Sequence, residues 1–343
     1  MRFSFSPEQQ ILAESAEQWA RQQSDHGFTR AAVAGKAVPL GDLWGQISEL
    51  GWLGVTIPDE AGGSGGSLVD ACIVAEALAR HLVPVPYVGN AVIAAAGLRA
   101  IGSDQGLLAD LAAGTCRFSV VLGEDFRWPP TSDSGLAWEW TEGDTLLVVD
   151  DGILSPRPDL EVCPLPTVDL LRPTARVEQL PRGPIPGGAE VDRFLATARV
   201  GLSALLLGMM DGALRRTVEY AQNRRQFGRA IGSFQAMQHL CAEMLVDTEA
   251  ARSAVYGAAW AVEHAAPARA ATAAATAKAW CASAAVRVCE AAMQVHGGIG
   301  MTWECDMHLY LRGSHLVRAA FCPGHADLEF VADALFADRE GLR

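Results

Sequence analysis

Two segments carry the most information in this chain: RRQFGRAIGSFQAMQ, residues Arg224–Gln238, and QVHGGIG, residues Gln294–Gly300. A guanidinium group presents a planar fork of donors that matches diphosphate oxygens, and a flat aromatic ring packs well on an adenosine. Consecutive glycines remove the side chains that would block a phosphate. The segments therefore predict a site for the adenine-diphosphate half of a dinucleotide. The candidate cofactor-binding residues are Arg224, Phe227, Gln235, Gln294, Gly297 and Gly298.

Each segment also has a purely structural explanation. Arg224 and Arg225 can be solvated charges at the end of a helix, with Phe227 in the core, and the glycine pair can be a helix C-cap alone. Phe227 lies three residues after Arg224, which favours the same helix face or its frayed end. His296 is predicted to be a spacer or a hydrogen-bonding surface residue, not a base.

Composition excludes several classes of protein. The chain has 343 residues, 50% of them hydrophobic, and a formal net charge of −13, which argues against a nucleic-acid partner because phosphate binding needs clustered Lys and Arg. The N-terminus MRFSFSPEQQ has no basic segment followed by an apolar run, so we expect no signal peptide. The apolar stretch Val200–Met210 is shorter than the roughly 20 residues that span a bilayer. We expect a cytoplasmic protein without a membrane partner.

Two further patterns are predicted to be structural. The cysteines form no C-x-x-C pair and have apolar neighbours, which predicts reduced core residues and no metal site. The loop IPDEAGGSGGS, residues 57–67, lacks the Lys-Ser/Thr ending of a phosphate-binding loop and is predicted to be flexible.

The pattern of apolar residues divides the chain into three regions. Residues 1–114 are predicted to form a helical domain, with helices starting after Ser6, over residues 43–50 and over residues 68–81. Residues 115–192 predict a small domain of short antiparallel strands, including residues 118–122, 136–140 and 145–149. Residues 193–343 predict a bundle of long helices. The predicted fold class is thus mainly α with a small β domain between two helical domains.

This order, together with particular motifs, resembles the flavin-dependent acyl-CoA dehydrogenases. The segment from Glu49 to Arg80 is similar to the N-terminal domain of that family, and the two opening motifs are similar to its C-terminal domain. The resemblance implies FAD as the cofactor and an acyl-CoA as the substrate. It also implies that the six candidate residues hold the ADP part of an FAD seated mainly in a neighbouring subunit.

The family requires one catalytic carboxylate, and this chain has none at either of the two positions that the family uses. In one branch the base directly precedes an Arg, which here gives Ala198 before Arg199. In the other branch it follows a Leu-Arg pair, which here gives Phe321, followed by Cys322. Neither Ala198 nor Phe321 can take a proton from carbon, so the resemblance implies that no catalytic residue is present at these positions.

The middle region also departs from the family. Where members carry a Thr/Ser-Glu-Pro segment against the flavin ring, this chain has Gly123 to Pro129, GEDFRWP. A retained ADP half beside a degraded ring half resembles the heteromeric acyl-CoA dehydrogenases of actinobacterial steroid side-chain catabolism. That likeness implies a second, catalytic chain as partner in a two-plus-two heterotetramer. It also implies a bulky acyl-CoA substrate, and an electron-transfer flavoprotein is a candidate electron acceptor.

Two alternatives stay open on sequence alone. The chain can be a self-sufficient flavoenzyme with a displaced base, for which Asp247 and Glu243 are the candidates, although a helical bundle needs acidic solvated faces anyway. It can also be a structural partner that binds no flavin. The retained Arg224 and glycine motif count against that third hypothesis, because a scaffold has no physical need for them.

Overall fold

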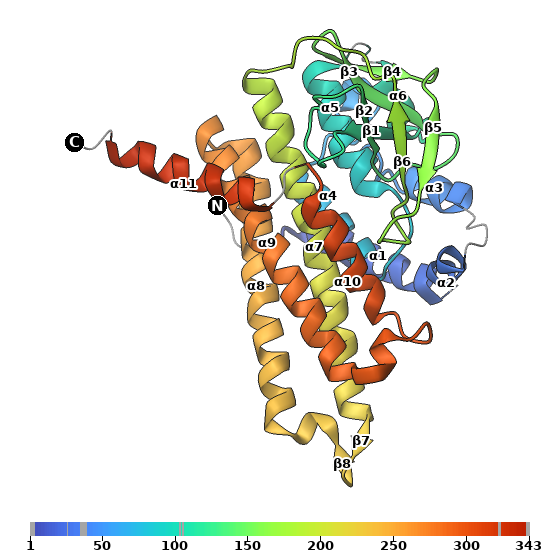
Figure 1. Cartoon of the computed structure of the whole chain (residues 1–343), viewed down its shortest axis with the longest axis vertical. Helices are drawn as coiled ribbons and strands as arrows, with labels where there is room; N and C mark the ends of the chain where they lie inside the picture. Colours follow the sequence, from blue (N-terminus) through green and yellow to red (C-terminus); the bar gives the residue numbers. More distant parts are fainter. Residues whose placement is uncertain are drawn as a thin grey trace.

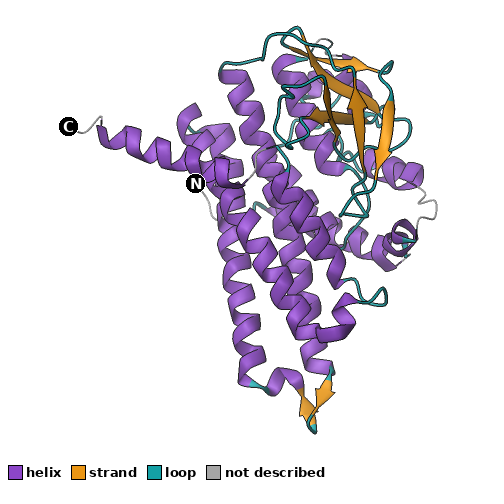
Figure 2. Ribbon diagram, viewed as in Figure 1, coloured by secondary structure: helices purple, strands orange, loops and turns teal. Residues whose placement is uncertain are grey.

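The computed structural model describes residues 4–25, 27–34, 40–102, 104, 106–321 and 324–340. Helices come first in the chain, a small sheet follows, and long helices form a bundle at the end (Figures 1 and 2). The predicted fold class is therefore confirmed. The sheet lies at one end of the bundle, and a short hairpin lies at the other end.

The N-terminal region is helical, as predicted. Ser6 caps the first helix, because its Oγ accepts a hydrogen bond from the Gln9 backbone N at 3.2 Å while Gln9 Oε1 accepts one from the Ser6 backbone N at 3.1 Å. Gly51 adopts a φ of 72°, the left-handed conformation predicted for a helix end. The elements are α1 (Pro7–Asp25), α2 (Phe28–Val33), α3 (Leu40–Glu49), η1 (Asp59–Ala61), α4 (Leu68–Arg80), the π-helical η2 (Val88–Ala94), α5 (Ala95–Ile101) and α6 (Gly106–Ala112).

The glycine-rich loop before α4 is tightly folded, not flexible as predicted. The Ser64 backbone N donates to the Gly54 carbonyl, and the Gly65 backbone N donates to the Ile57 carbonyl, each at 2.9 Å. A Cβ added to Gly63 would lie 2.0 Å from the Ile57 carbonyl oxygen, so two backbone segments approach as only glycine permits. The loop therefore has a defined shape, and one side of it lines a cavity.

Within the described residues, six strands form one sheet in the order β4-β3-β1-β2-β6-β5. The predicted antiparallel arrangement is wrong for one pair, because β1 and β3 are parallel, with Ser119 opposite Leu146. The chain path explains this: β2 runs back along one edge of β1, and β3 turns again to lie against the other edge. The strands are β1 (Phe118–Leu122), β2 (Ser134–Ala137), β3 (Thr145–Asp150), β4 (Ile153–Arg157), β5 (Val162–Leu165) and β6 (Thr174–Glu178).

The C-terminal region is the predicted helical bundle. Its elements are α7 (Ala189–Asn223), the hairpin of β7 (Arg225–Gln226) and β8 (Arg229–Ala230), η3 (Ile231–Ser233), α8 (Gln235–His264), α9 (Pro267–His296), η4 (Gly297–Met301), α10 (Met307–Ala319) and α11 (Gly324–Glu340). The predicted domain boundary at residue 192 falls inside α7, and both predicted boundaries stay predictions.

Helix α7 differs from the prediction made from Val200–Met210 alone. Among the described residues it is one helix that is long and apolar enough, by length and composition, to cross a membrane. However, 83% of its most apolar window is buried inside the protein, which is how the core helix of a bundle also behaves. Its apolar composition is accounted for by packing against α4, α8 and α9.

A buried cluster of charges joins four helices. The Arg80 guanidinium on α4 contacts the carboxylates of Glu17 on α1, Glu76 on α4 and Asp211 on α7. Arg252 on α8 also pairs with Glu76. Buried charges are tolerated only when they are paired and hydrogen-bonded, so this cluster fixes how the N-terminal helices meet the bundle.

The cysteines are less uniform than predicted. Cys72, Cys281 and Cys289 are buried, and burial raises the pKa of the Cys281 thiol to about 12. Cys163 in β5 is exposed, and Cys322 lies outside the described residues.

Candidate functional site

The first motif forms the end of α7 and a tight hairpin. Phe227 and Gly228 connect β7 to β8 with φ values of 50° and 78°, the two positive values that a two-residue hairpin turn of type I′ requires. The expectation that Phe227 continues the helix, or lies in the core, is therefore wrong. The turn leaves the Phe227 side chain 92% exposed. Arg224, directly after α7, is exposed and forms no ion pair within the described residues.

The second motif ends α9 at the same end of the bundle (Figure 1). Gly297 adopts a φ of 65°, and neither Gly297 nor Gly298 has any atom within 4 Å of a built Cβ, so this backbone is open to a ligand. The ring of His296 stacks on Tyr220, one turn before Arg224, with centroids 4.4 Å apart. This contact brings the two sequence motifs together.

The antiparallel packing of α8 and α9 places the two carboxamides at this end as well. Asp247 of α8 pairs with Arg287 of α9 at 3.0 Å. Counting outward from that pair, Gln294 is level with the first turns of α8, which begins at Gln235. All six predicted cofactor-binding residues are exposed at this end of the bundle. A cation, an aromatic ring, amides and a glycine turn without side chains fit the ADP half of a dinucleotide.

The structure also brings together the two positions that lack a carboxylate. Ala198 is fully buried in α7, one turn after Phe194. Phe321, after α10, is buried and packs edge to face on Phe194 with centroids 6.1 Å apart. Trp128 packs on the other side of Phe194 at 4.8 Å. Three aromatic rings thus fill the space around both positions, and this aromatic cluster does not fit a flavin ring or a proton-accepting group.

A carboxylate that the sequence analysis missed lies beside this cluster. Asp327 of α11 is fully buried, and its Oδ1 accepts a hydrogen bond from Arg199 Nε at 2.8 Å. Its other oxygen, Oδ2, accepts no hydrogen bond among the described residues. Since Arg199 follows Ala198 directly, Asp327 is close to the positions where a base is expected. No local signal marks it, because the pair is separated by 128 residues.

The two displaced-base candidates lie elsewhere. Asp247 and Glu243 line a groove between α8 and α9 together with Arg287. Arg287 holds both oxygens of Asp247, at 3.0 and 3.1 Å. Asp247 is therefore explained as one partner of an ion pair on the solvent-facing surface of the bundle.

Glu139 is a second missed carboxylate. It is 3% exposed and lies at the end of β2, where Oε2 accepts from the Gly89 backbone N at 3.0 Å and Oε1 lies 3.3 Å from Arg172 Nε. Burial raises the pKa of Glu139 to about 7, while Arg172 acts in the opposite direction. Although this pKa suits a base, both oxygens are engaged and enclosed. The group joins the sheet to η2.

Comparison with known proteins agrees with this geometry. Residues 6–114 match the acyl-CoA dehydrogenase N-terminal domain, and residues 187–335 match the acyl-CoA dehydrogenase C-terminal domain. The acyl-CoA dehydrogenase IpdE2 of Mycobacterium tuberculosis is 36% identical over 312 residues, covering 90% of this chain and 91% of that protein. The chain therefore belongs to the acyl-CoA dehydrogenase family.

Solved structures show the same fold over nearly the whole chain. The Tcur3481-Tcur3483 steroid ACAD, in its G363A variant, superimposes with a TM-score of 0.83 at 26% identity, covering 97% of this chain and 99% of that one. The ChsE4-ChsE5 complex of Mycobacterium tuberculosis gives a TM-score of 0.82 at 24% identity, covering 98% and 99%. The family makes FAD the cofactor and acyl-CoA oxidoreduction the chemistry.

Glu139 gives a testable pH dependence. Its ordinary pKa is 4.5 and its folded pKa is about 7, so between these values the folded state keeps a proton that the unfolded state has lost. Stability should therefore fall as the pH rises through this window. We expect Glu139→Gln to remove up to about 3 kcal/mol of the change in unfolding free energy across this pH window. Urea unfolding at a series of pH values measures that change. Exposed Glu178→Gln is the control, and an unchanged slope for Glu139→Gln would contradict this account.

Proposed function

We propose that this chain is the base-less subunit of a heteromeric, FAD-dependent acyl-CoA dehydrogenase. It contributes the ADP-binding half of the FAD site, and a partner chain contributes the catalytic carboxylate and the flavin-ring pocket. One observation carries the proposal. Apolar side chains pack around Ala198 and Phe321, whereas the six candidate residues at the hairpin end of the bundle, here called the cofactor end, are exposed.

The chain's own residues have distinct roles at the cofactor end. Arg224 donates charge-assisted hydrogen bonds to the diphosphate, and Phe227 packs against the adenosine. Gln235 and Gln294 donate and accept hydrogen bonds, and the absence of side chains at Gly297 and Gly298 lets a phosphate approach the backbone. When bound, FAD would supply the hydride acceptor for oxidation of the acyl-CoA.

The separation of the two ends supports a shared site. Ala198 and Asn223 belong to the same continuous helix, so they lie about 38 Å apart along its axis. That is further than an extended dinucleotide reaches. The cofactor end of this chain therefore serves a reaction centre in another chain. Removal of the α proton there requires a carboxylate, which the partner provides.

The related structures support a partner and a bulky substrate. The Tcur3481-Tcur3483 structure is named as a steroid ACAD, and the ChsE4-ChsE5 structure is named as a complex. By analogy we propose a two-plus-two heterotetramer in the cytoplasm that acts on a steroid side-chain acyl-CoA or a similarly bulky thioester. An electron-transfer flavoprotein is the proposed electron acceptor.

Flavin stoichiometry tests the proposal. Co-expressed with its partner, the chain should give about one FAD per two chains, because one ring pocket of each pair is filled by the aromatic cluster. The chain purified alone should be colourless or poorly soluble, since its interface is uncovered. The measurement is flavin absorbance against chain concentration. One tightly bound FAD per chain in a pure homo-oligomer would refute the shared site, and a flavin-free complex would favour the structural-partner hypothesis.

Arg224 should be required for flavin retention. A charge-assisted hydrogen bond contributes roughly 1.5 to 3 kcal/mol, so Arg224→Ala should weaken FAD binding by about tenfold or more. FAD retained by the complex after dialysis is the measurement. Arg269→Ala is a matched control, because Arg269 is an exposed arginine in the first turn of α9, away from the cofactor end. Equal retention in both variants would remove Arg224 from the site.

Asp327 favours a second candidate, a self-sufficient enzyme with a displaced base, because its Oδ2 is buried without a partner among the described residues while its Oδ1 pairs with Arg199, the residue after Ala198. Loss of a true base lowers the rate by roughly 10² to 10⁴. We expect Asp327→Asn, Asp247→Asn and Glu243→Gln each to leave anaerobic flavin reduction by substrate within a few-fold of normal. Removing the partner's carboxylate should stop it. A large, selective loss in Asp327→Asn, with FAD content and unfolding unchanged, would establish the displaced base instead.

A further inference from the structure

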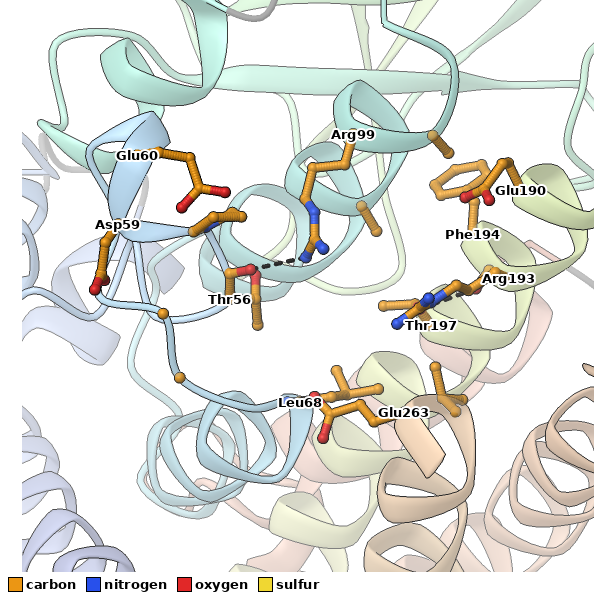
Figure 3. Close-up of a pocket in the computed structure, with 16 residues that line it drawn as sticks. Thr56, Asp59, Glu60, Leu68, Arg99, Glu190, Arg193, Phe194, Thr197 and Glu263 are labelled. Carbon is orange, nitrogen blue, oxygen red and sulfur yellow. Dashed lines mark hydrogen bonds between the residues drawn. The ribbon is translucent and has the colours of Figure 1, made fainter. Parts of the chain in front are cut away.

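A cavity of about 480 Å³ lies beside the aromatic cluster, since Phe194 is one of its lining residues, and it includes none of the six predicted cofactor-binding residues. It is enclosed by the glycine-rich loop before α4, by α5, by the first turns of α7 and by the last turn of α8 (Figure 3). This volume is within the roughly 300 to 1,000 Å³ typical of small-molecule sites. Because its walls come from four separate segments, the cavity is a product of the fold and not of one loop.

Two arginines point into this cavity from opposite sides (Figure 3). Arg99 comes from α5 and Arg193 from α7, and neither forms an ion pair among the residues that the structure describes. Arg99 Nη1 donates to the Thr56 carbonyl oxygen at 2.9 Å, which holds the side chain in place and leaves its other N–H groups available. Arg99 and Arg193 are exposed, whereas the partly buried Arg80 and the buried Arg172 are paired with carboxylates. Two unpaired guanidinium groups facing one space favour an anion.

The acidic residues of the lining limit how much negative charge a ligand can carry. Glu263 is engaged, because its Oε1 accepts from the Leu68 backbone N at 2.6 Å, and burial raises its pKa. Asp59 lies over Gly65, where a Cβ would be 2.8 Å from its Oδ1. Glu60 and Glu190 are exposed in the lining. Four carboxyl groups around two arginines suit a single anionic group and disfavour a polyanion such as a chain of phosphates.

The remaining walls of the cavity are apolar. Phe194 and Leu68 are buried, and their side chains line the cavity together with Ala96, Ala100 and Val262. An apolar lining with a few convergent polar groups is the usual composition of a small-molecule site. We propose that this cavity binds a small apolar carboxylate, with its anionic group between Arg99 and Arg193 and its hydrocarbon part on the apolar wall. The proposal does not rest on the shared FAD site.

Calorimetry on the chain with its co-purified partner tests the site, with octanoate, octanol and inorganic phosphate as probes. Octanoate should bind, and Arg99→Gln and Arg193→Gln should each weaken it by about tenfold or more, the effect of losing a charge-assisted hydrogen bond. Arg21→Gln, at an exposed arginine of α1, should have no effect. Octanol binding as tightly as octanoate, or displacement of octanoate by phosphate, would overturn the carboxylate assignment.

A second variant guards against misfolding as an explanation. Ala100→Leu keeps both arginines and fills part of the apolar wall, so it should also weaken octanoate binding by about tenfold. FAD content and the unfolding midpoint should stay unchanged in all of these variants, because none of the residues touches the cofactor end. Unaltered octanoate binding in Ala100→Leu, Arg99→Gln and Arg193→Gln together would show that the cavity is not the site. If one of these variants lost FAD instead, that result would bear on the shared cofactor site and not on this cavity.

Discussion

Burial of α7 is the constraint on which the rest of the structure depends. Its apolar window is 83% buried, and the helix carries a residue of each important feature: Phe194 in the aromatic cluster, Asp211 in the buried charge cluster and Tyr220 under the glycine motif. Because an α-helix is stiff over this length, these features keep fixed separations. Packing of one helix thus sets the distance between the exposed motif residues and the aromatic cluster.

Features encoded by neighbouring residues could be predicted from sequence. Ser6 and Gln9 form the expected helix start, and Gly51 ends α3 in the expected conformation. The strands predicted over residues 118–122 and 145–149 are present as β1 and β3, whereas β4 and β5 were not predicted, since Pro156 and Pro164 interrupt their patterns. Register and pair direction depend on distant partners, which explains why the parallel pair of β1 and β3 was missed.

The site was predictable only where it consists of sequence motifs. The resemblance predicts the cofactor-binding residues and the positions without a base, but the Arg199–Asp327 pair joins residues 128 apart, so no sequence motif indicates it. Phe227 was misassigned because the hairpin turn lacks the usual Asn or Asp before Gly228. Likewise, the glycine-rich loop is held by backbone contacts, which composition alone does not show.

The absence of a carboxylate at positions 198 and 321 involves the packing around these positions as well as the two side chains themselves. A carboxylate at position 321 would be buried against Phe194 and near Trp128, where an unpaired charge is costly. The neighbouring cation, Arg199, is already paired with Asp327. The aromatic cluster and this ion pair therefore form a packing arrangement that needs no carboxylate at position 198 or 321. Open, exposed groups at the other end of α7 remain available to a cofactor, so the two ends of one helix have come to serve different purposes.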